Sequence, residues 1–286
     1  MIDISEKRKE VKKKLRKLEG LPTLPPVVQK LCKMIEDERT SLNQIAELIE
    51  KDQVITTKVL RLANSAFYGF PRKVSTVNQA MMLLGMNVLK ILVMTSSIFD
   101  IIHKQDVGLW EHSIGVAACC KIIAERLEMK DAQEIATAGL LHDLGRVIEK
   151  VAFKEEHAEI EKLIKQGKDP LEAERATLGL DHAEVGAFLM SQWNIPERLI
   201  EAVLAHHNLD LTKKYKKEAS IIHLSDFLLH ARGYGETLYE RVPRLMVESL
   251  KILKISLPEI KEIFFSLEPK LYELKFFTEE LKNELS

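Results

Sequence analysis

The sequence has no excess of charge of either sign and no long apolar run. Lysine and arginine number 42 against 43 aspartate and glutamate, which gives a formal net charge of -1 at pH 7. This balance does not favour nucleic acid or an anionic membrane as the main partner. The longest apolar stretches are short and interrupted by charge, so we expect no membrane-spanning helix. The N-terminus (MIDISEKRKEVKKKLRKLEG) has no apolar segment of the kind found in secretory signals.

Cysteine is scarce. The chain has three, Cys32, Cys119 and Cys120. The number is odd, and the two adjacent residues are poorly placed to form a disulfide. We therefore expect free thiols and a cytoplasmic location, where thiols stay reduced.

The sequence also lacks convincing strand patterns, internal repeats and low-complexity tracts. Almost every segment carries apolar residues at helical spacing. At 286 residues the chain has room for one large domain or two moderate ones. We predict an all-α fold with no significant sheet: a helical domain preceded by an N-terminal helical subdomain.

Four regions follow from the helical pattern and its interruptions. Residues 1–20 form a basic helix with a thin apolar side, which favours a solvated, docked helix over one lying on a membrane. A proline-rich break at residues 21–26 opens an N-terminal helical half (21–105), in which Ser41 and Gln44 form a capping box. A second helical block covers residues 106–232. Residues 233–286 hold two or three closing helices, expected around 245–253, 257–267 and 272–285.

Seven residues of metal-ligand type lie in the second block, most of them on apolar helix faces. His112 leads an apolar face at helical spacing, and Asp226 lies between Ile222 and Leu229. Ionisable groups on core-facing positions are costly unless a partner or a metal satisfies them. Any one of them alone is best explained as a satisfied core residue, whereas the whole set favours metal binding. The seven are His112, His142, Asp143, His182, His206, His207 and Asp226.

Imidazole and carboxylate together bind divalent transition metals such as Fe, Mn, Zn, Co or Ni. The adjacent pair His142 and Asp143 can offer one carboxylate between two ions, about 4 Å apart as in two-metal phosphoester hydrolases. No thiolate joins the set, which argues against a structural zinc site. His223 and His230 flank Asp226 by three and four residues, and each either supports the ligands or has a purely structural role.

His112, the run from Gly139 to Arg146 (GLLHDLGR) and the distant Asp226 resemble the HD superfamily of metal-dependent phosphohydrolases. His182, His206 and His207 add a resemblance to its HD-GYP subgroup, which is associated with two- or three-metal sites and cleavage of cyclic di-GMP.

The N-terminal half is similar to the HDOD family, the HD-related output domain. The resemblance covers roughly residues 20–232 and implies an all-α bacterial signalling domain, usually without demonstrated catalysis. Its motifs agree in order along the chain: residues 21–25 (LPTLP), Asp52, residues 62–69 (LANSAFYG), residues 79–85 (QAMMLLG) and residues 193–196 (WNIP) before His206.

The HD-GYP pattern implies a ligand assignment. One ion would take His112, His142, Asp143 and Asp226, and a second would share Asp143 and add His182, His206 and His207. The chain departs from that pattern at three places. Gly108 replaces an expected carboxylate, with Glu111 nearby, which argues against a third metal. Arg146 replaces a lysine and keeps its charge. The loop after His207 has no Gly-Tyr-Pro, and residues 233–235 (GYG) are not a displaced copy of it.

Two hypotheses follow. The favoured one is a regulatory module that keeps its metal and binds a signalling partner protein acting in trans. The alternative is a phosphohydrolase or phosphodiesterase acting on a nucleotide or small phosphoester, in which Asp143 bridges the metals and Arg146 neutralises phosphate charge.

Overall fold

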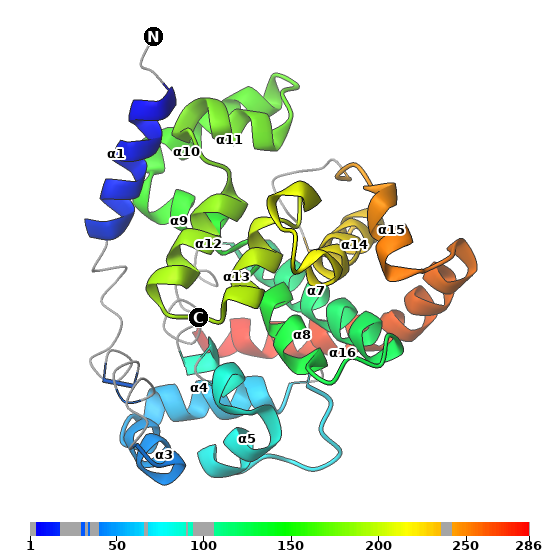
Figure 1. Ribbon diagram of the computed structural model, residues 1–286. Coiled ribbons are helices and arrows are strands. Elements are labelled where there is room, and N and C mark those ends of the chain that lie inside the picture. The colour runs from blue at the N-terminus through cyan, green and yellow to red at the C-terminus, as the bar shows by residue number, and fades with distance from the viewer. Residues whose placement is uncertain are drawn as a thin grey trace.

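The computed structural model describes residues 4–17, 30–31, 34, 40–65, 68–89, 91–93, 106–235 and 242–285. Within these ranges every regular element is a helix, so the predicted all-α fold is confirmed (Figure 1). The proline-rich break at 21–26 and Cys32 lie outside the described residues.

In the described part of the N-terminal half, three short helices have capping residues that fix their starts. They are α3 (Leu42–Glu50), α4 (Gln53–Ala63) and α5 (Val77–Leu84). The predicted capping box of Ser41 and Gln44 is present at the start of α3. Gly69 follows α4 with φ of 60°, the left-handed region that suits glycine.

The second block is built around the long helix α7 (Val107–Arg126), which contacts α8 (Ala132–Leu141) and α14 (Lys216–Arg232). Gly139 permits the close approach of α8, because a Cβ there would lie 2.7 Å from Cys120 Sγ. The remaining helices of the block are α9 (Leu144–Ala152), α10 (Lys154–Lys165), α11 (Pro170–Leu178), α12 (His182–Gln192) and α13 (Glu197–Leu204), followed by the short 3-10 helix η1 (Leu209–Leu211).

Helix α7 corrects one expectation from the sequence. By length and composition alone, it is apolar enough to cross a membrane, which none of the apolar runs was expected to be. However, 72% of its most apolar window is buried inside the protein. Its hydropathy therefore matches its place at the centre of the helical core.

The two halves share one continuous apolar core. The Tyr68 hydroxyl lies 3.4 Å from Thr137 Oγ1, and the Lys121 ammonium donates to the Tyr68 carbonyl oxygen. Asn87 Nδ2 donates to Glu134 Oε1 at 3.0 Å. The N-terminal half is thus packed directly onto the second block.

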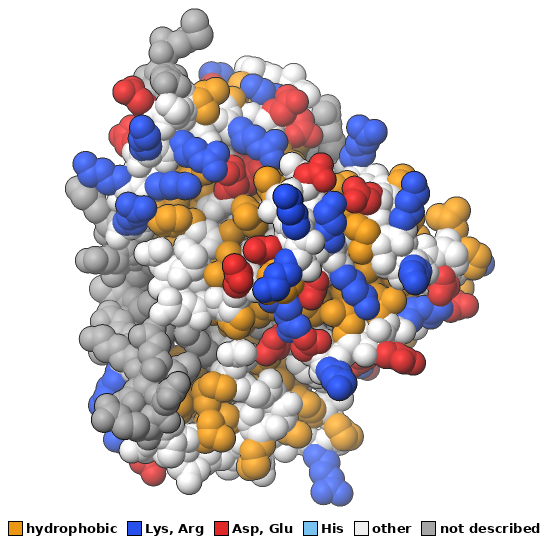
Figure 2. Space-filling model, in the orientation of Figure 1, with side chains coloured by type: hydrophobic (Ala, Val, Ile, Leu, Met, Phe, Trp, Pro, Cys, Tyr) orange, Lys and Arg blue, Asp and Glu red, His pale blue; other side chains and the backbone are white. Residues whose placement is uncertain are grey.

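Helix α1 (Ile4–Lys17) docks on α11 through a narrow apolar stripe in which Val11 and Leu15 are buried. Its basic residues lie on a face where charges of both signs are interspersed (Figure 2). The docked position agrees with the interpretation of a solvated helix with a thin apolar side.

At the C-terminus, α15 (Val247–Leu253) matches its prediction, but the next two predicted helices are one. Helix α16 runs without interruption over Leu257–Leu285, with Pro269 inside it, and packs against α7. Of the two or three closing helices expected from the sequence, the structure has two over residues 242–285, without a boundary at 267–272. Leu267, Leu271 and Leu274 are buried on both sides of the proline, and this continuous packing offsets the lost backbone hydrogen bond.

Candidate metal centre

The structure brings all seven predicted residues together. His112 lies on α7 and Asp226 on α14, both inside helices. The others lie at helix ends: His142 and Asp143 between α8 and α9, His182 at the start of α12, and His206 and His207 just after α13. Six are buried and His207 is partly buried.

His112, His142 and Asp226 form what we call the first cluster. One potential ligand atom from each lies within 4.8 Å of the others. Asp226 Oδ1 is 3.0 Å from His112 Nε2 and 3.6 Å from His142 Nε2. Two imidazoles thus share one carboxylate oxygen.

His182, His206 and His207 form the second cluster, with the same spread of 4.8 Å. His182 Nε2 and His207 Nε2 are 3.0 Å apart, and the rings of His206 and His207 lie 3.9 Å apart between centroids. This cluster contains no carboxylate of its own.

Asp143 lies between the clusters and presents one oxygen to each. Its Oδ2 is 3.5 Å from His142 Nε2, and its Oδ1 is 3.2 Å from His182 Nε2. Arg146 Nη1 contacts the same Oδ2 at 3.1 Å. A carboxylate in this position suits a bridge between two ions.

The outer nitrogens of four imidazoles face hydrogen-bond acceptors. His142 Nδ1 lies 2.8 Å from the Gly139 carbonyl oxygen, and His206 Nδ1 is 2.5 Å from that of Val203. His182 Nδ1 is 2.8 Å from a Glu174 carboxylate oxygen, and His112 Nδ1 is 3.4 Å from the Tyr234 carbonyl oxygen. Because a neutral imidazole carries one N–H, a neutral ring that donates from Nδ1 has the lone pair of its Nε2 pointing inward. This is the tautomer that binds metals through Nε2.

Burial lowers the pKa of His206 to about 3 and lowers the pKa of His207 and of His112 as well. These imidazoles are therefore neutral at physiological pH, as metal ligation requires. Burial also opposes charge on His142, but Asp143 and Asp226 outweigh it and raise the pKa of His142.

The two carboxylates are ionised. Burial raises the pKa of Asp143, but the charges of Arg146, His142 and His182 outweigh it and hold that pKa below its ordinary value. The pKa of Asp226 is also held below its ordinary value, because hydrogen bonds from its histidine neighbours overcome the effect of burial.

Several inward atoms have no hydrogen-bond partner among the described residues: His142 Nε2, His206 Nε2 and both carboxylate oxygens of Asp143. Buried polar atoms are normally satisfied, so four orphans around one point require an explanation. A cation between the imidazoles and carboxylates would satisfy all of them. The donor set, nitrogen and oxygen without sulfur, suits a divalent transition metal.

Two supporting contacts were not predicted from the sequence, those of Glu174 and Tyr234, and a third, that of His230, was left open there. Glu174 on α11 accepts from both the backbone N–H of His182, at 2.9 Å, and its ring. His230 Nε2 is 3.2 Å from Asp226 Oδ1, which supports the view of His230 as a partner of the ligands. Tyr234 belongs to the 233–235 segment and provides the carbonyl oxygen facing His112.

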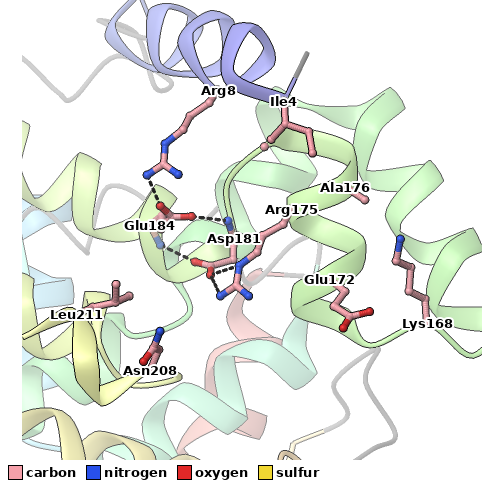
Figure 3. Close-up of a pocket in the computed structure, with 11 residues that line it drawn as sticks. Ile4, Arg8, Lys168, Glu172, Arg175, Ala176, Asp181, Glu184, Asn208 and Leu211 are labelled. Carbon is pink, nitrogen blue, oxygen red and sulfur yellow. Dashed lines mark hydrogen bonds and ion pairs between the residues drawn. The ribbon is translucent and has the colours of Figure 1, made fainter. Parts of the chain in front are cut away.

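The start of α12, where His182 lies, is held by two ion pairs beside a cavity of about 620 Å³ (Figure 3). Arg175 points at Asp181 Oδ2, with Nη2 at 2.6 Å, and Arg8 of α1 pairs with Glu184. Asp181 and Glu184 form the capping box predicted from the sequence. Close packing fixes the other side, since a Cβ at Gly145 would lie 2.0 Å from the His182 carbonyl oxygen.

A second cavity, of about 380 Å³, opens onto the centre. His207, Asp226 and Arg146 line its inner end, and residues 242–246 form part of its wall. Glu111, the carboxylate considered for a third metal, is engaged elsewhere, because the Thr278 hydroxyl donates to it at 3.2 Å.

The all-α fold and its buried centre of histidine and aspartate side chains define the structural class of this protein. Comparison with known families then identifies its family. The model of the HDOD domain matches residues 21–209. The chain belongs to the HDOD family.

The relatives agree with this assignment. An uncharacterized protein of Treponema pallidum (strain Nichols) is 26% identical over 250 residues, which are 82% of this chain and 47% of that protein. The uncharacterized protein YuxH of Bacillus subtilis (strain 168) is 22% identical over 152 residues, 52% of this chain and 35% of YuxH. The chain therefore spans about half the length, or less, of these relatives.

Solved structures share the fold. An HDOD domain protein of unknown function from Geobacter sulfurreducens is 26% identical, with a TM-score of 0.72 over 98% of this chain and 99% of that one. A proposed phosphohydrolase from Shewanella amazonensis SB2B is 24% identical (TM-score 0.68, 96% and 98% covered). A proposed signal transduction protein from Marinobacter aquaeolei VT8 is 19% identical (TM-score 0.69, 99% and 66% covered).

Proposed function

We propose that this HDOD protein is a metal-binding regulatory module of bacterial signal transduction, in the cytoplasm. The observation that carries the proposal is the convergence of seven imidazole and carboxylate groups with orphaned atoms at one buried point. Satisfied core residues alone do not account for it, because His142 Nε2, His206 Nε2 and both carboxylate oxygens of Asp143 have no hydrogen-bond partner among the described residues. Buried polar atoms without a partner are costly, and a bound cation would satisfy them.

The proposed ligand assignment is the complete set of the HD-GYP pattern. One ion takes His112, His142, Asp143 and Asp226. The second shares Asp143 and takes His182, His206 and His207. The two oxygens of Asp143, which face opposite clusters, support the shared role. Fe, Mn, Co, Ni and Zn all accept this donor set.

The regulatory role rests on HDOD membership and on the helical N-terminal half, which is packed rigidly on the metal-bearing block through Tyr68 and Lys121. The partner is a signalling protein acting in trans. A change at the centre reaches the N-terminal half through α7, which carries His112 and Lys121, and through α8, which carries Thr137 and ends directly before His142.

A second candidate function, hydrolysis of a nucleotide or small phosphoester, is favoured by the cavity that opens onto the centre. Bound divalent ions would supply a water of lowered pKa and neutralise phosphate charge. In this chain Asp143 would hold the reacting groups between the clusters, and Arg146 would orient Asp143 and offset phosphate charge.

Metal analysis and activity assays test both candidates. The purified full chain is loaded with manganese or iron, its metal content is measured by mass spectrometry, and hydrolysis is followed on AMP, cyclic dinucleotides and p-nitrophenyl phosphate. Asp143→Ala is the test variant, and Asp210→Ala, on an exposed turn, is the control. We expect bound metal in the wild type and the control, lost in Asp143→Ala. Wild-type protein without metal under every loading condition would disprove the metal centre. Turnover that disappears with Asp143 would favour the hydrolase over the purely regulatory module.

A further inference from the structure

The wall of the cavity beside the metal centre includes a segment that lies outside the matched HDOD region. Residues 242–246 connect to α15, and Arg244 within them lines the cavity together with Arg146. Among the described residues, none forms an ion pair with Arg244. An arginine that lines a cavity and has no carboxylate partner in the described part of the chain can receive an incoming anion.

Two contacts fix this segment in place. His223 on α14 bridges it to the metal centre: its Nδ1 lies 2.9 Å from the His206 carbonyl oxygen, and its Nε2 accepts from the Met246 N–H at 2.9 Å. Met246 also packs on a small apolar cluster formed by Ala205, Leu209 and Ala219. The position of Arg244 is therefore restricted on both sides. Met246, two residues further on, is fixed by a hydrogen bond and by apolar packing, and the ring of Pro243 restricts the backbone just before Arg244.

The charges in the cavity favour an anion once metal is bound. Its lining has two arginines and two carboxylates, Asp169 and Asp226. Asp226 is turned toward His112 and His230, and Asp169 accepts from the Glu172 N–H as the cap of α11. The charges of the two arginines and the two carboxylates cancel. Every bound divalent ion therefore adds net positive charge at the inner end of the cavity, beside the metal centre.

The remaining walls and the volume limit the size of the ligand. Apolar side chains of Pro170, Leu171, Val242 and Met246 flank the charged groups. A volume of about 380 Å³ lies near the lower end of small-molecule sites, which span roughly 300 to 1,000 Å³. This size suits one phosphate with one small ring system better than a cyclic dinucleotide.

We infer that the cavity binds a phosphorylated small molecule of mononucleotide size, with Arg244 at its phosphate group and the apolar wall against its ring. The inference rests on the proposed metal centre, which provides the positive inner end. It assigns a binding role to a segment beyond residues 21–209, whether the outcome is regulation or hydrolysis.

The test uses AMP as the probe in titration calorimetry on the manganese-loaded full chain, with adenosine as the uncharged comparison. The variants are Arg244→Ala and Arg244→Lys. The control is Arg72→Ala, an exposed arginine of the N-terminal half. We expect AMP to bind more tightly than adenosine, and Arg244→Ala to weaken AMP binding by about 10- to 100-fold, since a charge-assisted hydrogen bond is lost. Arg244→Lys should restore part of the affinity, and Arg72→Ala should change nothing.

Metal content, measured on every sample, separates this inference from the proposed function. Normal metal content with equal AMP affinity in wild type and Arg244→Ala overturns the inference and leaves the metal centre intact. Tighter binding of cyclic di-GMP than of AMP overturns the assigned ligand size. Absence of metal defeats the proposed function, and the Arg244 comparison in that metal-free protein still decides the anion site.

Discussion

The two clusters differ in how far the protein alone satisfies them. In the first, Asp226 Oδ1 has three imidazole neighbours, His112, His142 and His230, at 3.0 to 3.6 Å. Imidazole N–H groups can thus satisfy this oxygen without a metal, and the raised pKa of His142 makes that ring a positive partner. The second cluster has three imidazoles and no carboxylate except the shared Asp143. It follows that the second cluster depends more on bound metal, and the first more on its own hydrogen bonds.

Removing one ligand from each cluster gives the largest effect. We expect Asp226→Ala to abolish the first ion and His207→Ala the second, each leaving half of the bound metal, because the other position keeps all four of its ligands. Metal content per chain by mass spectrometry is the measurement. Loss of all metal from both variants would show that the clusters act as one site.

Each cluster also has a glycine against it. A Cβ at Gly145 would lie 2.0 Å from His182 O, and one at Gly235 would lie 2.5 Å from His112 N. We expect Gly145→Ala to lower the free energy of unfolding by ~1–3 kcal/mol or more and to weaken metal binding at the second cluster. Gly235→Ala should weaken metal binding at the first cluster.

Gly233→Ala is the matched control for Gly235→Ala. Both glycines have positive φ, but nothing lies within 4 Å of a Cβ at Gly233. Urea denaturation and metal content measure the effects. Equal losses of stability and of bound metal in the Gly233 and Gly235 variants would show that backbone conformation causes the effect and not crowding of His112.

The acceptors on Nδ1 provide a smaller but more selective test. His112, His142 and His206 face backbone carbonyls, which no side-chain substitution removes. His182 depends on Glu174. We expect Glu174→Gln to reduce metal affinity at the second cluster by about 10- to 100-fold, with the first unchanged. Glu172→Gln, exposed on the same helix, is the control, and an unchanged affinity in Glu174→Gln would make Glu174 purely structural.

Glu149, buried near Glu174 and both clusters, gives the smallest expected effect. Among the described residues neither of its carboxylate oxygens has a hydrogen-bond partner, and burial together with Glu174 raises its pKa well above the ordinary value. Since the unfolded chain releases this proton at lower pH, the carboxyl group destabilises the fold increasingly as pH rises above about 4.5.

We therefore expect Glu149→Gln to stabilise the metal-free protein by ~1–3 kcal/mol at pH 8 and by less at pH 5. Urea denaturation at the two pH values measures the difference. A stability gain that does not grow with pH would show that Glu149 is already satisfied in the folded protein.

The sequence alone singled out the seven residues that the structure brings together, because imidazoles and carboxylates are unusual on the apolar faces of predicted helices. The capping boxes of Ser41 and Asp181 were predicted for a similar local reason. Glu174 was missed, since an isolated glutamate in a charged stretch gives no sign of the residue it meets. The number of closing helices stayed open, because only the burial of Leu267, Leu271 and Leu274 shows that α16 continues through Pro269.

His223 has a mechanical consequence. One rigid ring joins the backbone of His206, inside the centre, to the backbone of Met246, at the start of α15. Hydrogen bonds tolerate only a few tenths of an ångström of stretch before they weaken. A shift of the His206 backbone must therefore either break one of these two bonds or carry Met246 with it. Through His223 the state of the buried centre is coupled to the position of a surface helix.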